Sequence, residues 1–164
     1  MTPSSERSMR ARAYAHGLIC DDVREEMLGT QTYVGVLGDQ TKVQSFPGSF
    51  ANLCFVGWFV LPLKDTPVRS VRVILEIPDG SELKTDQTMV DVDPMVVPGI
   101  RRRLVRAVVR YQFVQILREG WLRVYMEIDS RRWLAAETYV SKEPGIALAL
   151  ASTLTQAHTA RKVD

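Results

Sequence analysis

Apolar and polar residues alternate along much of this chain, and the alternation predicts strands rather than helices. Within residues 69–77 the odd positions from 71 to 77 are apolar and most even positions are polar, as in a strand with one solvated face. Residues 122–128 repeat the pattern, and residues 133–140 continue it after a short polar connection at 129–132. The last two segments therefore predict a β-hairpin.

Other segments add strands of different kinds. Residues 53–61 are apolar on both parities, which is typical of a strand that is covered on both faces and lies in the middle of the fold. Residues 13–20 and 29–38 are further strand candidates, separated by glycine and aspartate turns. Short strands at regular spacing predict an all-β fold, namely an antiparallel β-sandwich of about seven to nine strands.

Residues 100–118 fit two patterns. A helix would group Ile100, Leu104, Ala107 and Tyr111 on one face, whereas a strand would group Val105, Ala107, Val109 and Tyr111. The richness in valine, tyrosine and phenylalanine favours the strand. The helix remains the alternative.

A chain of 164 residues has the size of one domain, and no internal repeat divides it. We expect a flexible N-terminus over 1–12, a β-sandwich domain over 13–143, and a C-terminal helix or tail over 144–164. The composition shifts to alanine, leucine and threonine after Pro144, which predicts a helix over 146–159.

The cysteines and the lack of targeting segments predict the cellular compartment of the protein. Cys20 and Cys54, the two cysteines, lie in apolar stretches and predict buried, reduced thiols. Residues 1–12 hold no apolar run of the length that a secretory signal needs. The longest apolar run, 50–63, is too short for a membrane span and is interrupted by Asn52 and Pro62. We therefore expect a cytoplasmic protein that does not bind membranes.

Charge is nearly balanced overall but uneven along the chain. The 21 basic and 19 acidic residues give a net charge of +2, too small to attract a polyanion over the whole surface. Basic residues nevertheless concentrate at Arg101, Arg102, Arg103, Arg106 and Arg110. Guanidinium forks suit phosphate and carboxylate groups, so these arginines are the candidate anion-binding residues. A solvated face, offset by the acidic residues of 64–97, is the favoured interpretation.

No spacing of residues predicts a catalytic or metal site. His16 and His158 are the two histidines, too few with the two cysteines to form a typical zinc site. The glycines of 35–38 lack the lysine of a phosphate-binding loop. We therefore predict no catalytic residue, no metal and no cofactor. The candidate acids and bases of an unrecognised enzyme would be Asp21, Asp22, Asp91 and His16.

Several short motifs resemble a known family. These are the run Cys20-Asp21-Asp22-Val23-Arg24-Glu25-Glu26, then Gly29-Thr30, Tyr33-Val34-Gly35-Val36, Phe46-Pro47 and Glu119-Gly120-Trp121. Together with strand residues up to Val140, they resemble an uncharacterised family of small bacterial and phage β-rich proteins, over most of residues 13–141. The resemblance implies a β-sandwich and carries no activity.

These observations predict a non-enzymatic binding or assembly module of a bacterial or phage cytoplasm. Sheets of this kind leave edge strands, so we expect a protein partner or a homo-oligomer. One alternative function is anion, nucleotide or nucleic-acid binding through the arginine-rich segment, and nucleic acid is the less favoured partner. The other alternative is an enzyme with an unrecognised site.

Overall fold

The computed structural model describes residues 13–62, 71–85, 89–91, 102–128 and 130–144. In these ranges the chain is nearly all β-strand, with one 3₁₀ turn at Met27–Gly29 and no α-helix. The expected flexible segment 1–12 and the expected helix over 146–159 lie outside the described residues. No helix in the described part of the chain is long and apolar enough to cross a membrane.

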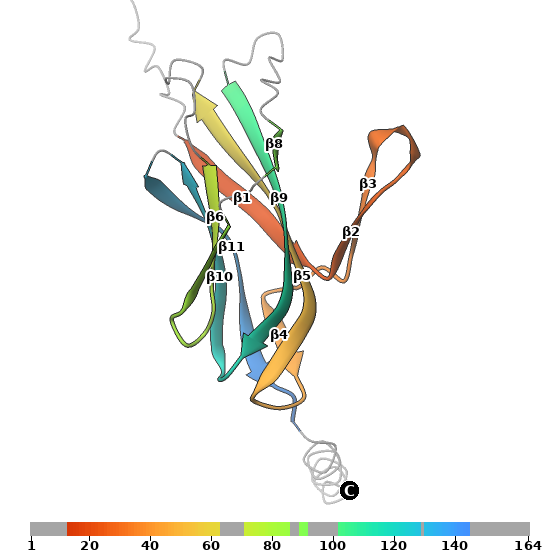
Figure 1. Cartoon of the computed structure of the whole chain (residues 1–164), viewed down its shortest axis with the longest axis vertical. Helices are drawn as coiled ribbons and strands as arrows, with labels where there is room; N and C mark the ends of the chain where they lie inside the picture. The colour runs from red at the N-terminus through yellow and green to blue at the C-terminus, as the bar shows by residue number, and fades with distance from the viewer. Residues whose placement is uncertain (1–12, 63–70, 86–88, 92–101, 129, 145–164) are drawn as a thin grey trace, which may run out of the picture.

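Two sheets form the body of the molecule (Figure 1). The first sheet has the order β1-β5-β9-β8, with β1 at Tyr14–Cys20, β5 at Gly48–Pro62, β9 at Arg102–Ile116 and β8 at Met89–Asp91. The second has the order β4-β11-β10-β6-β7, with β4 at Gln40–Val43, β11 at Arg131–Lys142, β10 at Gly120–Ile128, β6 at Val71–Glu76 and β7 at Glu82–Thr85. A separate hairpin pairs β2 (Asp22–Glu25) with β3 (Gln31–Val34).

The inner faces of the two sheets share one apolar core. Phe55 and Phe59 of β5 belong to the same buried cluster as Leu75 of β6 and Met126 of β10. The ring of Trp133 in β11 packs against Phe59, with centroids 4.6 Å apart. Alternation of inward apolar and outward polar residues along β6 and β10 thus places one face of each strand in this core.

β5 is the strand that the sequence predicts to be covered on both faces, and this is confirmed. It lies between β1 and β9, and its residues Leu53 to Phe59 are buried except Trp58, which is half-buried. One face supplies the main core. The other supplies a small cluster in which Cys54 and Val56 pack with Cys20 and Val23. The second cluster exists because the β2–β3 hairpin covers part of the outer face.

The ambiguous segment 100–118 is a strand over its described part. β9 pairs antiparallel with β5 along almost its whole length, from Gly48 opposite Ile116 to Pro62 opposite Arg102. The expected hairpin of 122–140 is also confirmed as β10 and β11. Its connection is shorter than expected, because Arg131 and Arg132 already belong to β11 and Ser130 turns the chain with a φ of 66°.

Three features depart from the sequence-based expectation. The described residues form eleven strands, where about seven to nine were expected. The strand expected over 29–38 ends at Val34, because Gly35 takes a left-handed φ of 62°. The pairing is also not all antiparallel, since β4 runs parallel to β11. Between these elements the chain passes from one sheet to the other. The Leu37 N–H donates to the Ile19 carbonyl of the first sheet at 2.8 Å, and the Tyr139 N–H of the second donates to the Asp39 carbonyl at 2.9 Å.

Candidate functional site

The outer face of the five-stranded sheet carries paired charges. Arg123 lies 3.5 Å from Glu76 and 3.2 Å from Glu137, on the strands to either side of it. Arg132 lies 2.8 Å from Glu82, and Lys84 lies 3.1 Å from the same carboxylate. Cross-strand pairs of this kind are typical of a solvated sheet face, so this face is not the candidate site.

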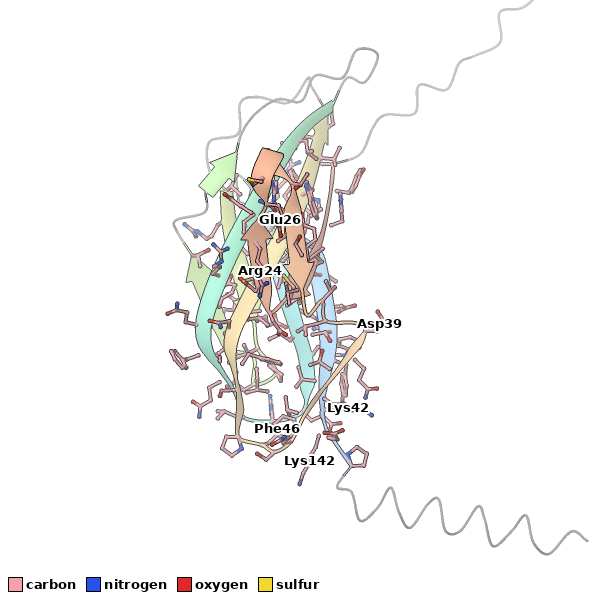
Figure 2. The ribbon with its side chains drawn as sticks, turned by 90° about the vertical axis from the view of Figure 1, so that its right-hand side faces the viewer. Arg24, Glu26, Asp39, Lys42, Phe46 and Lys142 are labelled. Atoms are coloured by element: carbon pink, nitrogen blue, oxygen red, sulfur yellow. The ribbon has the colours of Figure 1, made fainter. Side chains whose placement is uncertain are left out.

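The outer face of the four-stranded sheet differs, because the β2–β3 hairpin lies against it. Figure 2 shows the hairpin, with Arg24 and Glu26 labelled, in front of that sheet. Val23 of the hairpin is 3% exposed and packs with Cys20, Cys54 and Val56. We call this surface, from β1 across β5 to β9 with the hairpin on it, the hairpin face.

Two of the five candidate arginines bind the hairpin. The Arg110 Nη2 donates to the carbonyl oxygen of Val23 at 2.6 Å. The Arg106 Nη2 donates to the side-chain oxygen of Gln31, and its Nε is buried without a hydrogen-bond partner among the described residues. Both guanidinium groups therefore hold a neutral oxygen of the hairpin.

For Arg102 and Arg103, two further candidate arginines, the structure describes the backbone. Arg102 and Arg103 lie in β9 opposite Pro62 and Leu61, and Arg101 lies outside the described residues. Acidic residues of 64–97 were expected to offset this segment, and the backbone of Asp91 does lie opposite Arg106. Anion binding by the segment stays a prediction.

Cys20 and Cys54 are buried free thiols that lie directly opposite each other in β1 and β5. Burial, with smaller contributions from Cys54 and Asp21, raises the pKa of Cys20 to about 11. Burial also raises the pKa of Cys54, against the opposing effect of Arg110. The Cys54 thiol donates a weak hydrogen bond to the Asp21 carbonyl at 3.6 Å. A protonated, buried thiol is a poor nucleophile.

Asp22 and His16, two of the candidate acids and bases, have contacts in the described part of the chain. Asp22 accepts from the Val23 N–H at 2.8 Å and from the Arg24 Nε at 3.3 Å, both within the hairpin. His16 stacks between Tyr14 and Trp58, with centroid distances of 5.7 and 5.5 Å. In the described ranges, no three histidine, cysteine, aspartate or glutamate residues are grouped to hold a metal ion.

The four-stranded sheet ends at β1, which has no ladder partner on the side away from β5, although β11 lies close to it. The Ile19 carbonyl accepts from Leu37, and the Asp21 N–H donates to the Val34 carbonyl, so odd-numbered residues here point away from β5. β1 pairs with β5 in one continuous register, and backbone direction alternates along an antiparallel strand. The N–H and C=O of Ala15 and Gly17 therefore also point outward. We call these four groups the open edge.

The edge strands β4, β7 and β8 are short and charged, and β4 and β8 each cover only part of a longer neighbour, β11 and β9. β4 and β7 have four residues each and carry Lys42, Glu82 and Lys84, and β8 has three residues and carries Asp91. β1 has seven residues, Tyr-Ala-His-Gly-Leu-Ile-Cys, with no Asp, Glu, Lys, Arg or Pro. Charge and short length are the usual protection of an edge against strand pairing, and β1 has neither.

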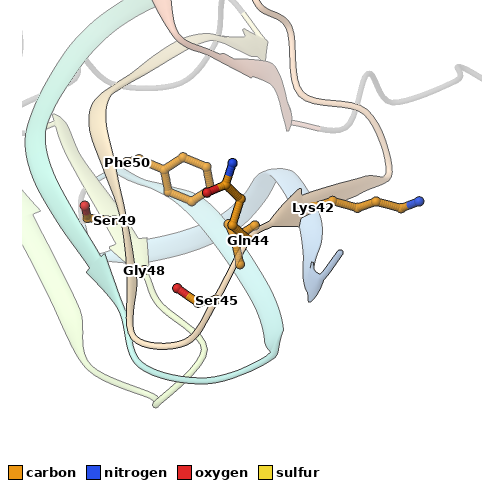
Figure 3. A pocket seen from close by; sticks show the side chains of 7 residues that line it. Lys42, Gln44, Ser45, Gly48, Ser49 and Phe50 are labelled. Atoms are coloured by element: carbon orange, nitrogen blue, oxygen red, sulfur yellow. The ribbon is translucent and has the colours of Figure 1, made fainter. Parts of the chain in front are cut away.

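A hollow of about 400 Å³ lies at another place, between β4 and β5 (Figure 3). Residues 42–45 and 48–50 line it, with Lys42 at its rim and the ring of Phe50 beside it. Its polar groups are serine hydroxyls, one amide and one ammonium. No described titratable pair converges there, so the hollow offers no acid–base chemistry.

The sequence signal for the open edge was present but incomplete. An uncharged strand over 13–20 is readable from the residues, whereas its place at the edge of a sheet depends on pairing with a strand about forty residues away. Ala15 and Gly17, which carry the open edge, have no functional side-chain group and were not among the candidate residues. His16, between them, was a candidate only as an acid or base.

Comparison with protein-family models and with curated protein sequences gives no match. The resemblance of residues 13–141 to an uncharacterised bacterial and phage family therefore stays a prediction.

Proposed function

We propose that this protein is a non-enzymatic binding module, built as a β-sandwich, that takes an extended protein segment as an added strand along β1. The observation that carries the proposal is the open edge: four outward backbone groups of Ala15 and Gly17 on an uncharged seven-residue strand. Strand addition uses such groups as its main source of affinity. The shared core of the two sheets supports the sandwich architecture.

Both faces of β1 fit an added strand. On the outer face Tyr14 is 44% exposed, His16 is exposed and Leu18 is half-buried, so alternate side chains of a bound segment would meet aromatic and aliphatic groups. On the inner face Ala15 and Gly17 are small and half-buried. The backbone groups of β1 then supply affinity, and the side chains on its outer face supply selectivity. A cytoplasmic setting agrees with two buried free thiols.

The extent of the site is set by the fold. On the C-terminal side of Gly17, the Ile19 carbonyl already accepts a hydrogen bond from the Leu37 N–H, so an added strand has to end there. The site therefore accommodates a short segment, centred on His16. A partner has to present about five extended residues, without a proline opposite Ala15 or Gly17.

The test is binding of a fluorescent peptide with the sequence of residues 13–19, measured by anisotropy. In the variant Ala15→Pro the outward N–H is lost, and no ladder bond to β5 is broken because that N–H does not point toward β5. We expect Ala15→Pro to weaken peptide binding at least about fivefold, the equivalent of one backbone hydrogen bond.

The matched control is Lys84→Pro on β7, an edge strand that the proposal does not use. The Ile77 N–H donates to the Ser81 carbonyl, so Ser81 and Leu83 face β6 and the Lys84 N–H points away from β6. Circular dichroism first establishes that each variant is folded. Equal peptide affinity of the wild type, Ala15→Pro and Lys84→Pro would refute strand addition at β1, as would a monomeric wild type that binds no peptide.

A further inference from the structure

We propose that the segment added at β1 is β1 of a second copy of this chain, antiparallel and with His16 on the two-fold axis. This inference rests on the proposed function. It names the partner strand and its register, and it can be wrong while the proposed function is right.

The register follows from which backbone groups are open. Ala15 and Gly17 are two residues apart, so pairing Ala15 of one copy with Gly17 of the other, and the reverse, makes four hydrogen bonds and satisfies the whole open edge. Centring the pair on Gly17 would instead set Ala15 opposite Ile19, whose carbonyl already accepts from Leu37. A shift by one residue would oppose groups that point toward β5.

The same register makes the side chains self-complementary. It sets Tyr14 of each copy opposite Leu18 of the other, an aromatic–aliphatic pair of the kind that stabilises antiparallel strands. It sets His16 opposite His16, beside the stacked rings of Tyr14 and Trp58. No charged residue lies in β1, so two copies bring no fixed like charges together.

Self-pairing at β4 lacks this complementarity, because a symmetric pair of β4 strands would bring Lys42 of the two copies close together. At β7, Glu82 is already paired within each copy with Lys84 and Arg132. Pairing at β1 closes a two-fold dimer and joins the two four-stranded sheets into one sheet of eight strands.

Cysteine cross-linking distinguishes this register from others. In the proposed dimer the two residues at position 16 face each other at a narrow, non-hydrogen-bonded pair, with Cα atoms about 4.5 Å apart. That spacing lies within the range for a disulfide. We expect His16→Cys to form a covalent dimer on mild oxidation with glutathione disulfide, seen by non-reducing electrophoresis.

Tyr14→Cys is the matched control, because it changes an exposed side chain on the same face of the same strand. The two residues at position 14 are four residues apart along the paired strands, about 13 Å, too far for a disulfide. We expect little covalent dimer from this variant or from the wild type. Light scattering of the wild type is expected to give twice the monomer mass.

Three results would separate the claims. A monomeric wild type that still binds the residue 13–19 peptide would overturn the second copy as partner and leave strand addition standing. Equal cross-linking of His16→Cys and Tyr14→Cys would overturn the register. A monomeric wild type that binds no peptide would overturn both proposals.

Discussion

Phe55 shows how single residues shape the sheet that carries the open edge. Its ring lies over Gly17 and Gly57, which face each other in β1 and β5. A Cβ at Gly57 would lie 2.2 Å from the Phe55 ring and 3.0 Å from the sulfur of Met126. The two glycines therefore leave the space that a large ring fills in the core.

Gly57→Ala is expected to destabilise the protein by about 2–3 kcal/mol, since the added methyl group overpacks a full core. Gly38→Ala is the control, because nothing lies within 4 Å of a Cβ at that position. Urea unfolding monitored by fluorescence measures both. A Gly57→Ala variant as stable as Gly38→Ala would mean that Phe55 has room to move.

Phe113 combines a left-handed backbone, φ 55°, with a side chain that is 78% exposed. The register of β5 with β9 omits it, so it interrupts the ladder. Asparagine tolerates this conformation better than an aromatic residue does, and we expect Phe113→Asn to raise stability by about 1 kcal/mol. Phe113→Val should lower it, because β-branched residues are strained there. If urea unfolding gives the same change in the free energy of unfolding for both variants, the backbone at Phe113 is not strained.

Protonation of the Cys20 thiol makes the stability of the fold depend on pH in the alkaline range. The pKa of its thiol rises from 9.0 in the unfolded chain to about 11 in the fold, chiefly through burial. The folded state thus holds the proton more tightly, so this contribution is complete below pH 9 and is lost as the pH rises from 9 through 11.

Between pH 8 and pH 10.5 we expect the wild type to lose about 1–2 kcal/mol more stability than Cys20→Ala does. Urea unfolding of both proteins at the two pH values measures this loss. Lysines and tyrosines titrate in both proteins, so their effect cancels when the two losses are subtracted. An identical alkaline loss in both proteins would show that the thiol is not held protonated.

At the scale of the elements, the hairpin depends on two arginines of β9. Arg110 donates to the Val23 carbonyl at 2.6 Å, and Arg106 donates to Gln31 on the neighbouring hairpin strand. Beyond these contacts, Val23 and Tyr33 attach the hairpin through the small apolar cluster. The hairpin therefore has few contacts with the body for its length.

Arg110→Gln is expected to speed amide exchange in residues 22–34 by about tenfold or more, since a hydrogen bond from a charged group contributes about 1.5–3 kcal/mol. Exchange in β10 should not change. Arg118→Gln is the control, because Arg118 donates to the Pro78 carbonyl at 3.0 Å, on a different part of the molecule. Unchanged exchange of the hairpin in Arg110→Gln would show that this bond does not hold it.

The sequence predicted the elements whose faces differ in polarity and missed those defined by long-range partners. β6, β10 and β11 alternate clearly because one face is solvated, and β5 is apolar on both parities because the hairpin covers part of its outer face. The bonds of Arg106 and Arg110 join residues 75 and 87 positions away. No local pattern contains such a pairing, so the arginines were interpreted as an anion site or a solvated face.

At the scale of the whole molecule, the two outer faces and the sheet edges have different roles. The five-stranded sheet carries paired charges, the four-stranded sheet carries the hairpin, and β1 carries the open edge. The sequence indicated that some strand would be an edge. Which strand it is depends on the order β1-β5-β9-β8, which no alternation pattern encodes. The proposed function thus comes from topology rather than from side-chain chemistry.

The central claim is that the backbone of Ala15 and Gly17 pairs with an added strand. Amide hydrogen exchange of these two residues, measured by NMR as a function of protein concentration, tests it most directly. The account predicts that both amides exchange quickly in dilute protein and slow together as concentration rises, while the outward amide of Lys84 in β7 does not change. Exchange at Ala15 and Gly17 that is independent of concentration, with and without the residue 13–19 peptide, would contradict it.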